Sequence, residues 1–134
     1  MANALYPSFK ELLLGGDIDL AADTIKVALI DTGTYTYSSA HDFYNDVSAG
    51  VVGTPQTLGS KSITAGVFDA ADVTYTAVSG STVEAYIIYK DTGNVATSPL
   101  IAYLDTGQTG LPVTPNGGDI TITFDSGASK IFAL

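Results

Sequence analysis

The sequence has 134 residues, a length that suits one folded domain, because two separate cores would leave each half too small to bury enough apolar surface. Fourteen acidic residues against five lysines and no arginine give a formal net charge of −9, which disfavours binding to nucleic acid or to an anionic membrane. The absence of cysteine excludes disulfides and thiolate zinc sites.

Only 14% of the residues are charged, while 46% are hydrophobic. Much of the surface must then be built from uncharged Thr, Ser, Gly, Ala and Tyr, a composition suited to contact with another protein. No stretch approaches the roughly 20 apolar residues of a membrane span, and residues 1–16 lack the apolar region of a signal peptide. We therefore expect synthesis in the cytosol and no membrane partner.

The first element is an expected amphipathic helix from Ala4 to Leu14, which Gly15 and Gly16 end. Its apolar residues recur at helical spacing and form one face, made of Leu5, Phe9, Leu12 and Leu13. Such a short helix is unstable alone. Residues 1–16 are thus predicted to be a helical N-terminal arm that packs on its own domain or on a neighbouring subunit.

The rest of the chain is dominated by short apolar or alternating runs bounded by Gly, Pro, Asn and Asp, the usual signal for strands. One segment differs: Ser39 to Val47 fits a short internal helix, with Ser39 as the cap and Asp42 as a capping-box acid. Residues 48–55 contain Gly and Pro and are expected to form a loop. The predicted strands are Thr24 to Asp31, Lys61 to Thr64, Val67 to Asp69, Asp72 to Val78, Ala85 to Tyr89, Leu100 to Leu104, residues 119–125 and Lys130 to Leu134.

This order of elements predicts a single, mainly β domain spanning residues 1–134. The architecture expected is an antiparallel β-sandwich or a strongly curved antiparallel sheet, with the N-terminal helix and the short internal helix added. The two most apolar runs, Ala85 to Tyr89 and Leu100 to Leu104, are predicted to be its central strands.

The tripeptide Asp-Thr-Gly occurs three times, at Asp31, Asp91 and Asp105. After an apolar strand it is the catalytic motif of aspartic proteases, in which two such carboxylates share a proton; Asp31 and Asp105 are the candidates for that chemistry. Asp and Gly are also the residues that a tight turn at the end of a strand requires. Three copies, one of them after a lysine, favour turns over an active site.

No metal or cofactor site is expected. Asp17, Asp19 and Asp23, like Asp69 and Asp72, lack the glycine and distal acid of a calcium-binding loop. The single histidine, His41, has no second His or Cys to complete a transition-metal site.

The eight tyrosines suit either protein interfaces or the core, because each combines a large rigid ring with a polar tip. On this basis the candidate interface residues are those of the helix face, Leu5, Phe9, Leu12 and Leu13, together with Tyr35, Tyr37, Tyr86 and Ile88. We further expect the face formed by Glu84, Tyr86 and Ile88 to be covered by the helix or by a neighbouring subunit.

Three segments of the sequence resemble a group of small virion proteins of tailed bacteriophages. They are YPSFKELLLGGDIDLAADTIKVALIDTGTYTYSSAHDF, EAYIIYKDTGNVATSPLIAYLDTGQTGLPVTPNGGDITITF and KIFAL. The similarity covers nearly the whole chain and includes no catalytic signature. It implies a structural component of the virion, similar to the decoration or cement proteins that bind the outside of a capsid.

Such a protein is expected on the capsid surface, without enzymatic activity or cofactor, where it binds the major capsid protein and copies of itself, perhaps as a trimer. A tail, neck or fibre component is the alternative within the same class. Two alternatives from other classes stay open: an aspartic-type hydrolase using Asp31 or Asp105, and a receptor- or glycan-binding module using exposed tyrosines.

Overall fold

The computed structural model describes residues 3–124, 127–128 and 130–134 and is built on one five-stranded sheet. Its strands lie in the order β1 (Ala4–Leu5), β8 (Leu100–Leu104), β7 (Ala85–Lys90), β2 (Ile25–Ile30) and β3 (Val51–Thr57). Every neighbouring pair is antiparallel. The two most apolar runs of the sequence are thus adjacent strands inside this sheet, as predicted.

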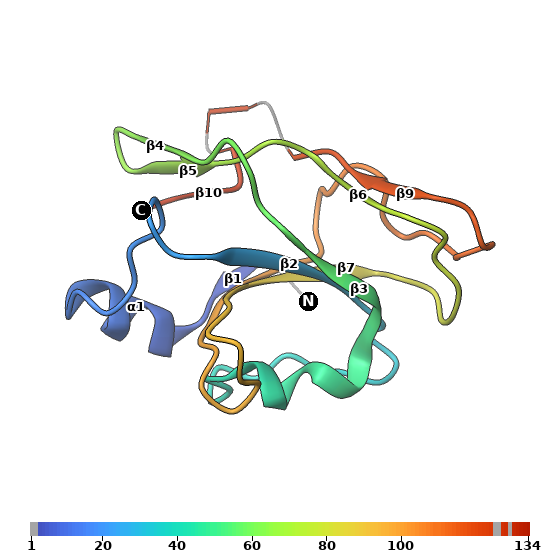
Figure 1. Cartoon of the computed structure of the whole chain (residues 1–134), viewed down its shortest axis with the longest axis horizontal. Helices are drawn as coiled ribbons and strands as arrows, with labels where there is room; N and C mark the ends of the chain where they lie inside the picture. Colours follow the sequence, from blue (N-terminus) through green and yellow to red (C-terminus); the bar gives the residue numbers. More distant parts are fainter. Residues whose placement is uncertain (1–2, 125–126, 129) are drawn as a thin grey trace.

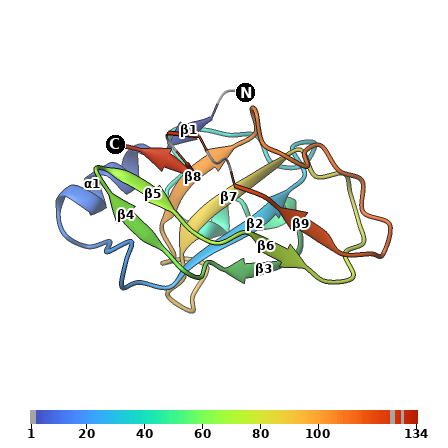
Figure 2. The same ribbon diagram turned by 90° about the horizontal axis from the view of Figure 1, so that it is seen from above.

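Two small antiparallel sheets form a second layer over one face of the central sheet (Figures 1 and 2). One contains β10 (Phe132–Ala133), β5 (Val67–Asp69) and β4 (Ser62–Thr64), and the other pairs β6 (Val73–Tyr75) with β9 (Ile120–Ile122). The fold is therefore mainly β, and its packed sheets are consistent with the predicted β-sandwich.

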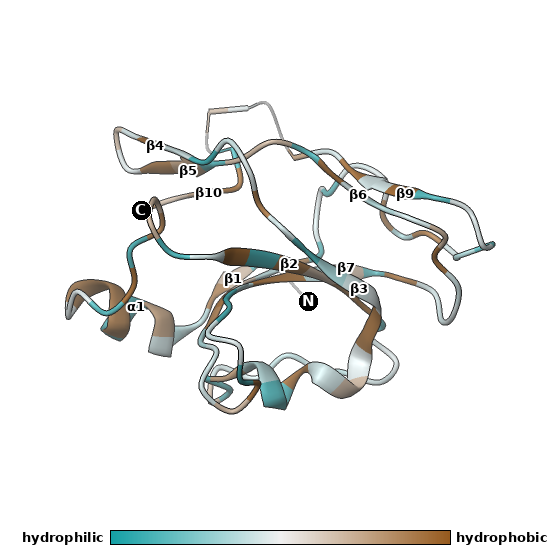
Figure 3. Ribbon diagram, in the orientation of Figure 1, coloured by the Kyte–Doolittle hydropathy of each residue, from teal (hydrophilic) through white to brown (hydrophobic). Residues whose placement is uncertain are grey.

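The hydrophobic core lies on both faces of the central sheet. Every residue of β8, and every residue of β7 before Lys90, is buried. On the sandwich side Tyr86 meets Phe124 edge to face, with ring centroids 5.9 Å apart. On the other side Tyr44 stacks on Tyr89 at 4.4 Å. The brown strands at the centre of Figure 3 correspond to this doubly covered sheet.

The face that carries Tyr86 and Ile88 is covered, but by the second β layer. Helix α1 (Pro7–Leu14) lies at one end of the sheet instead (Figure 1). Phe124, which follows β9 of the second layer, contacts Tyr86 on this face. The expectation that the helix or a neighbouring subunit would cover it is wrong, because the chain's own C-terminal strands fill that space.

The N-terminal helix exists but begins three residues later than the pattern predicted. Ala4 and Leu5 form β1 and pair with β8, and the helix starts at Pro7. Proline disfavours helical backbone at the preceding residue and suits the first helical position. Tyr6 accordingly is extended, with φ −68° and ψ 134°. Gly15 and Gly16 end the helix as expected, Gly16 with a positive φ of 83°.

The helix packs on its own domain. Phe9 is fully buried and meets Phe132 of β10 edge to face, with ring centroids 5.8 Å apart. Leu5, Leu12 and Leu13 are partly buried against the same core. Of the two possibilities left open for the arm, packing on its own sheet is the one observed.

The internal helix predicted from Ser39 to Val47 is not formed. The segment contains one short 3-10 turn instead, Tyr44–Asp46, and a second, Ser48–Gly50, follows it. Asp42 does not cap a helix there; its backbone N–H donates to Asp46 Oδ2 at 3.0 Å. The chain reverses direction between Tyr35 and β3, and short 3-10 turns are common in such connections. In this arrangement the ring of Tyr44 stacks on Tyr89.

Strand β3 was missed by the sequence pattern, which indicated a loop over much of it. β3 is an edge strand of the central sheet. Pro55 has no N–H to donate to a neighbouring strand, and an edge strand tolerates that loss on its outer side. Gly53 has a positive φ of 72°, and the register with β2 shifts between Val27 and Leu29. An irregular edge strand tolerates the residues that usually indicate a loop.

The other strands agree with the predicted segments. The bounds of β5 and β8 are those predicted, β7 extends one residue further, and β2, β4, β6, β9 and β10 are shorter than predicted. Residues 125 and 126, within and after the predicted strand 119–125, lie outside the described part of the chain. No helix in the described ranges is both long enough and apolar enough to cross a bilayer.

Candidate functional site

The first two Asp-Thr-Gly tripeptides are turns in which the carboxylate accepts backbone hydrogen bonds. Asp31 Oδ1 accepts from Gly33 N–H at 2.8 Å, and Asp91 Oδ1 accepts from Gly93 N–H at 2.9 Å. Asp31 Oδ2 also accepts from the Thr34 hydroxyl at 3.0 Å. Both carboxylates therefore stabilise the exit from a strand, as the turn interpretation predicted.

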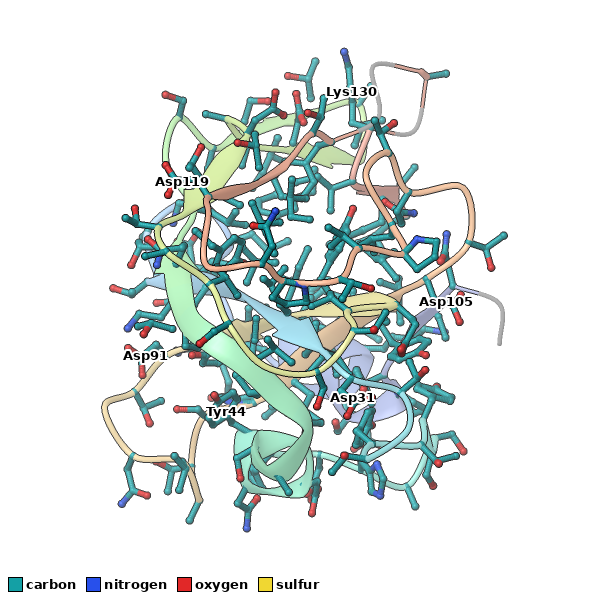
Figure 4. The ribbon with its side chains drawn as sticks, turned by 90° about the vertical axis from the view of Figure 1, so that its right-hand side faces the viewer. Asp31, Tyr44, Asp91, Asp105, Asp119 and Lys130 are labelled. Carbon is teal, nitrogen blue, oxygen red and sulfur yellow. The ribbon has the colours of Figure 1, made fainter. Side chains whose placement is uncertain are left out.

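The third copy is held by the side chain of Asn3, the residue before β1. Asn3 Oδ1 accepts from Asp105 N–H at 2.7 Å and from Thr106 N–H at 2.9 Å, while Asn3 Nδ2 donates to the Thr106 carbonyl at 3.0 Å. Figure 4 shows Asp31 and Asp105 coming from separate elements at one end of the molecule. Each of the two catalytic candidates is thus engaged in the turn of its own strand.

Charge is distributed unevenly between the two ends of the central sheet. At the start of β2 and the end of β7, Lys26 Nζ lies 2.9 Å from Asp91 and Lys90 Nζ lies 3.1 Å from Asp23. Lys61 Nζ also donates to the Asp23 carbonyl there. Three of the five lysines are therefore bound at one end of the sheet.

The opposite end carries an open pocket of about 400 Å³. Antiparallel pairing brings the end of β2, the start of β7 and the end of β8 together there, with Tyr86 opposite Leu104 and Glu84 N–H donating to the Ile30 carbonyl at 3.1 Å. The lining combines two carboxylates, three tyrosines and three threonines: Glu84, Asp105, Tyr35, Tyr37, Tyr103, Thr32, Thr36 and Thr106.

One carboxylate of the pocket is fixed by the neighbouring turn. Glu84 Oε2 accepts from the Thr32 N–H at 2.9 Å and from the Thr32 hydroxyl at 2.6 Å. The middle residue of the first Asp-Thr-Gly therefore orients Glu84. The sequence pattern singled out the Asp of this tripeptide, whereas its Thr is the residue that reaches the pocket.

The three tyrosines that line the pocket belong to a cluster of four, which Tyr6 completes from below the surface. The ring of Tyr37 lies 5.2 Å from Tyr6 and 5.4 Å from Tyr103, and Tyr35 lies 6.3 Å from Tyr103. The hydroxyls of Tyr6 and Tyr35 are 2.8 Å apart, and that of Tyr35 is 2.9 Å from His41 Nδ1. Within this cluster only Tyr37 is half-exposed, so it presents its ring to the pocket.

The buried tyrosines stay protonated. Burial is the main cause of the raised pKa of Tyr6, Tyr35 and Tyr103. The negative charges of Asp105 and Glu84 raise the pKa of Tyr103 further. Both carboxylates thus act electrostatically on Tyr103, which lines the pocket.

Gly50 allows the chain to close around this cluster. A Cβ at Gly50 would lie 2.7 Å from the Cβ of Tyr35, closer than side chains approach. Gly50 also binds the turn after β2, because its carbonyl accepts from Asp31 N–H at 2.8 Å. The position of Tyr35, and with it the pocket wall, depends on a residue without a side chain.

Half of the eight candidate interface residues lie inside the domain. Phe9, Tyr35, Tyr86 and Ile88 are buried, and of these only Tyr35 reaches a surface pocket. In this fold Phe9, Tyr86 and Ile88 offer no surface to a partner, because each fills the core. Leu5, Leu12, Leu13 and Tyr37 are partly buried and retain some exposed area.

Within the described ranges, no group of three or more His, Asp or Glu side chains is arranged to hold a metal ion. The carboxylates of Asp19 and Asp23 instead bind nearby backbone: Asp23 Oδ2 accepts from Asp19 N–H at 2.8 Å, and Asp19 Oδ1 accepts from Ala21 N–H at 3.0 Å.

Comparison with known proteins adds no relative: the chain matches no protein-family model and no curated protein sequence.

Sequence reasoning missed the pocket because its lining comes from three distant segments. Glu84 was noted only as an outward residue, and Tyr103 only as one of several tyrosines. One signal was present: Glu84 is a lone carboxylate at the start of an otherwise apolar strand. Because a charged side chain is rarely buried without a partner, a carboxylate at that position indicates that the strand begins there, next to a polar site.

Proposed function

We propose that this protein is a non-enzymatic structural protein of a tailed-bacteriophage virion, a head decoration protein that binds the assembled major capsid protein and stabilises the shell. The observation that carries the proposal is the resemblance of residues 6–43, 84–124 and 130–134 to small virion proteins. The partners are the major capsid protein and further copies of the chain, with a trimer as the expected assembly.

The use of the Asp-Thr-Gly carboxylates supports a structural role over hydrolysis. The carboxylates of Asp31 and Asp91 accept hydrogen bonds within their own turns, and Asp105 Oδ1 accepts from the Thr106 hydroxyl while its backbone N–H donates to Asn3. An aspartic hydrolase needs two such carboxylates close enough to share a proton. Each tripeptide here instead stabilises the end of one strand.

The surface chemistry is also consistent with binding to a protein shell. The subunit is acidic and low in total charge, which keeps it soluble and disfavours contact with packaged DNA. Exposed apolar side chains are available for contacts between subunits, among them Ile63 at 51% exposed and Leu134 at 66%. A shell that carries many such small domains opens only if many contacts break together.

The test is to mix the purified protein with separated heads and tails of the phage that encodes it, and to sediment each mixture. We expect the protein to bind expanded heads, saturating at a copy number fixed by the number of capsomers. Heads that already carry the protein are the matched control and should bind no more. Decorated heads should release DNA at a higher temperature than undecorated heads.

Binding to tails alone, or binding of a few copies at a single vertex, would contradict the decoration role and would indicate a tail or neck component instead. Proteolysis by the purified protein at acid pH, abolished by Asp31→Asn or Asp105→Asn, would contradict a purely structural role.

A further inference from the structure

We propose that strand β4 is a docking edge for a second copy of the chain, and that the two β4 strands pair antiparallel across a two-fold axis at Ile63. β4 is the outermost strand of its sheet, and among the described residues only β5 pairs with it (Figure 2). All three of its residues are exposed. An exposed strand edge is a template to which another strand can add.

The first argument is the direction of the backbone groups of Ile63. A two-residue turn follows Thr64, with positive φ angles of 53° at Ala65 and 78° at Gly66, as in a type I′ hairpin. The residue next to such a turn exchanges both backbone hydrogen bonds with the partner strand, and the residue one step further does not. Ile63 lies one step further, opposite Phe68. Its N–H and C=O therefore point away from β5, towards the open edge.

The second argument is that β4 lacks the features that usually prevent strand addition. It contains no proline, glycine or charged residue, and its register with β5 has no shift. β3, another edge strand, is interrupted by the positive φ of Gly53 and by Pro55. Lys61, the residue before β4, donates to the Asp23 carbonyl, so its charge is held against its own domain. The edge of β4 is thus open to a further strand.

The third argument is the register that a second copy allows. With Ile63 opposite the Ile63 of the copy, Ser62 lies opposite Thr64 and Lys61 lies opposite Ala65. Serine and threonine side chains can form a cross-strand hydrogen bond, and no like charges face each other directly. The relation is two-fold, so Ile63 of each copy both donates and accepts. A second copy therefore satisfies this edge without any other partner.

The fourth argument is the apolar surface beside the edge. Pairing at Ile63 forms only two backbone hydrogen bonds, so side chains must supply much of the stabilisation. Ile63 is 51% exposed and Leu134 is 66% exposed, and both line an apolar groove of about 370 Å³ that also includes Phe68 and Phe132. Opposite residues of antiparallel strands point to the same face, so the Ile63 of the copy lies at the edge of this groove. Its burial there removes apolar surface of both copies from water.

The inference goes beyond the virion role and does not depend on it. A two-fold contact joins two copies, whereas the trimer expected of a decoration protein is built from three-fold contacts. The two kinds of assembly are therefore distinguished by mass.

The experiment is sedimentation equilibrium of the purified protein over a range of concentrations. We expect a monomer–dimer equilibrium that shifts towards the dimer as salt is added, because salt screens the formal charge of −9 on each subunit. Ile63→Lys should weaken the dimer at least about tenfold, since two like charges then replace two apolar side chains at the axis. The matched control is Val95→Lys, which adds the same charge at another apolar residue that is 51% exposed, outside β4, and should leave dimerisation unchanged.

Amide hydrogen exchange tests whether the contact is strand pairing. The N–H of Ile63 should exchange at least about tenfold more slowly in concentrated than in dilute protein, because only the dimer gives it an acceptor. The N–H of Thr64 points towards β5 and should change less.

A monomer at every concentration, an equal weakening by Val95→Lys, or exchange of the Ile63 N–H that does not depend on concentration would overturn the proposal. A trimer that Ile63→Lys leaves intact would also overturn it, while agreeing with the assembly expected of a decoration protein. If a variant does not fold, the sedimentation and exchange of the unaltered protein still decide. Failure of these tests leaves the head-binding test unaffected, because that test measures a contact with the capsid.

Discussion

Single side chains connect the layers of this fold. The clearest is Tyr75 of β6, whose hydroxyl donates to the Val27 carbonyl of β2 at 2.7 Å inside the core. The bond joins the second layer to the central sheet, and burial raises the pKa of Tyr75 above its usual value. A buried polar group of this kind is costly to leave without its partner.

Tyr75→Phe should therefore lower the free energy of unfolding by about 1–2 kcal/mol, because the Val27 carbonyl loses its donor while the ring is retained. Urea denaturation measures the change. The matched control is Thr74→Val on the same strand, which removes only the exposed hydroxyl contact to Thr121 and should change stability by less than about 0.5 kcal/mol. Equal effects of the two substitutions would mean that the buried bond contributes nothing.

The second residue-scale prediction concerns acid. The hydrogen bond from Lys26, followed by that from Gly93 N–H, lowers the pKa of Asp91 below its usual 3.8. A carboxyl group whose pKa is lower in the folded state stabilises the fold above its unfolded pKa, and this contribution is lost as the pH falls through the folded pKa. The pair should therefore stabilise the protein at neutral pH and not at pH 2.

A double-mutant cycle with Lys26→Gln and Asp91→Asn measures this pair. The coupling should be about 0.2–1 kcal/mol at pH 7, since both side chains are partly exposed, and close to zero at pH 2. A coupling that persists at pH 2 would contradict the ionic origin of the interaction.

At the scale of elements, helix α1 depends on tertiary packing. It has eight residues, too few to be stable in isolation, and its N-cap residue Tyr6 makes no side-chain capping bond. Phe9 anchors the helix between β8 and β10, where it contacts Phe132. The four apolar residues grouped by sequence therefore divide between two elements, with Leu5 in β1 and the others in the helix.

Phe9→Ala should cost about 3–5 kcal/mol, because it leaves a cavity at a fully buried site. Leu14→Ala on the same helix is the control, since Leu14 is 88% exposed, and it should change stability by less than about 0.5 kcal/mol. Denaturant titration of both variants gives the comparison. A small cost for Phe9→Ala would show that the helix contributes little to the core.

At the scale of the whole molecule, one core connects all layers. The same cluster of buried residues includes Phe9 of α1, Ile88 of β7, Tyr75 of β6 and Phe132 of β10. Segments joined in this way are expected to unfold together.

Calorimetry should therefore show one transition, with a van't Hoff enthalpy equal to the calorimetric enthalpy. The same temperature of half-unfolding should be found by circular dichroism and by tyrosine fluorescence. Two separate transitions would mean that the small sheets and the central sheet are independent units, contrary to the single-domain prediction.

The sequence by itself determined the mainly β class, most of the strands and the turns that end them. Alternating and apolar runs predicted the strand segments and the mainly β class, because those patterns reflect which faces are buried. The Asp-Thr-Gly turns were also predictable, since Asp and Gly satisfy the needs of a strand end locally. Both the strand patterns and the choice of Asp and Gly for a turn depend on residues that are close together in the sequence.

Tertiary structure alone decided three features. It made β3 a strand despite Gly53 and Pro55, because an edge position tolerates them. It used Tyr86 and Ile88 as core, because the C-terminal strands cover their face. It brought Thr32, Glu84 and Asp105 to one pocket through antiparallel pairing of three segments. Local pattern carries no information about such long-range pairing, and that is the physical reason why only the folded molecule contains a site.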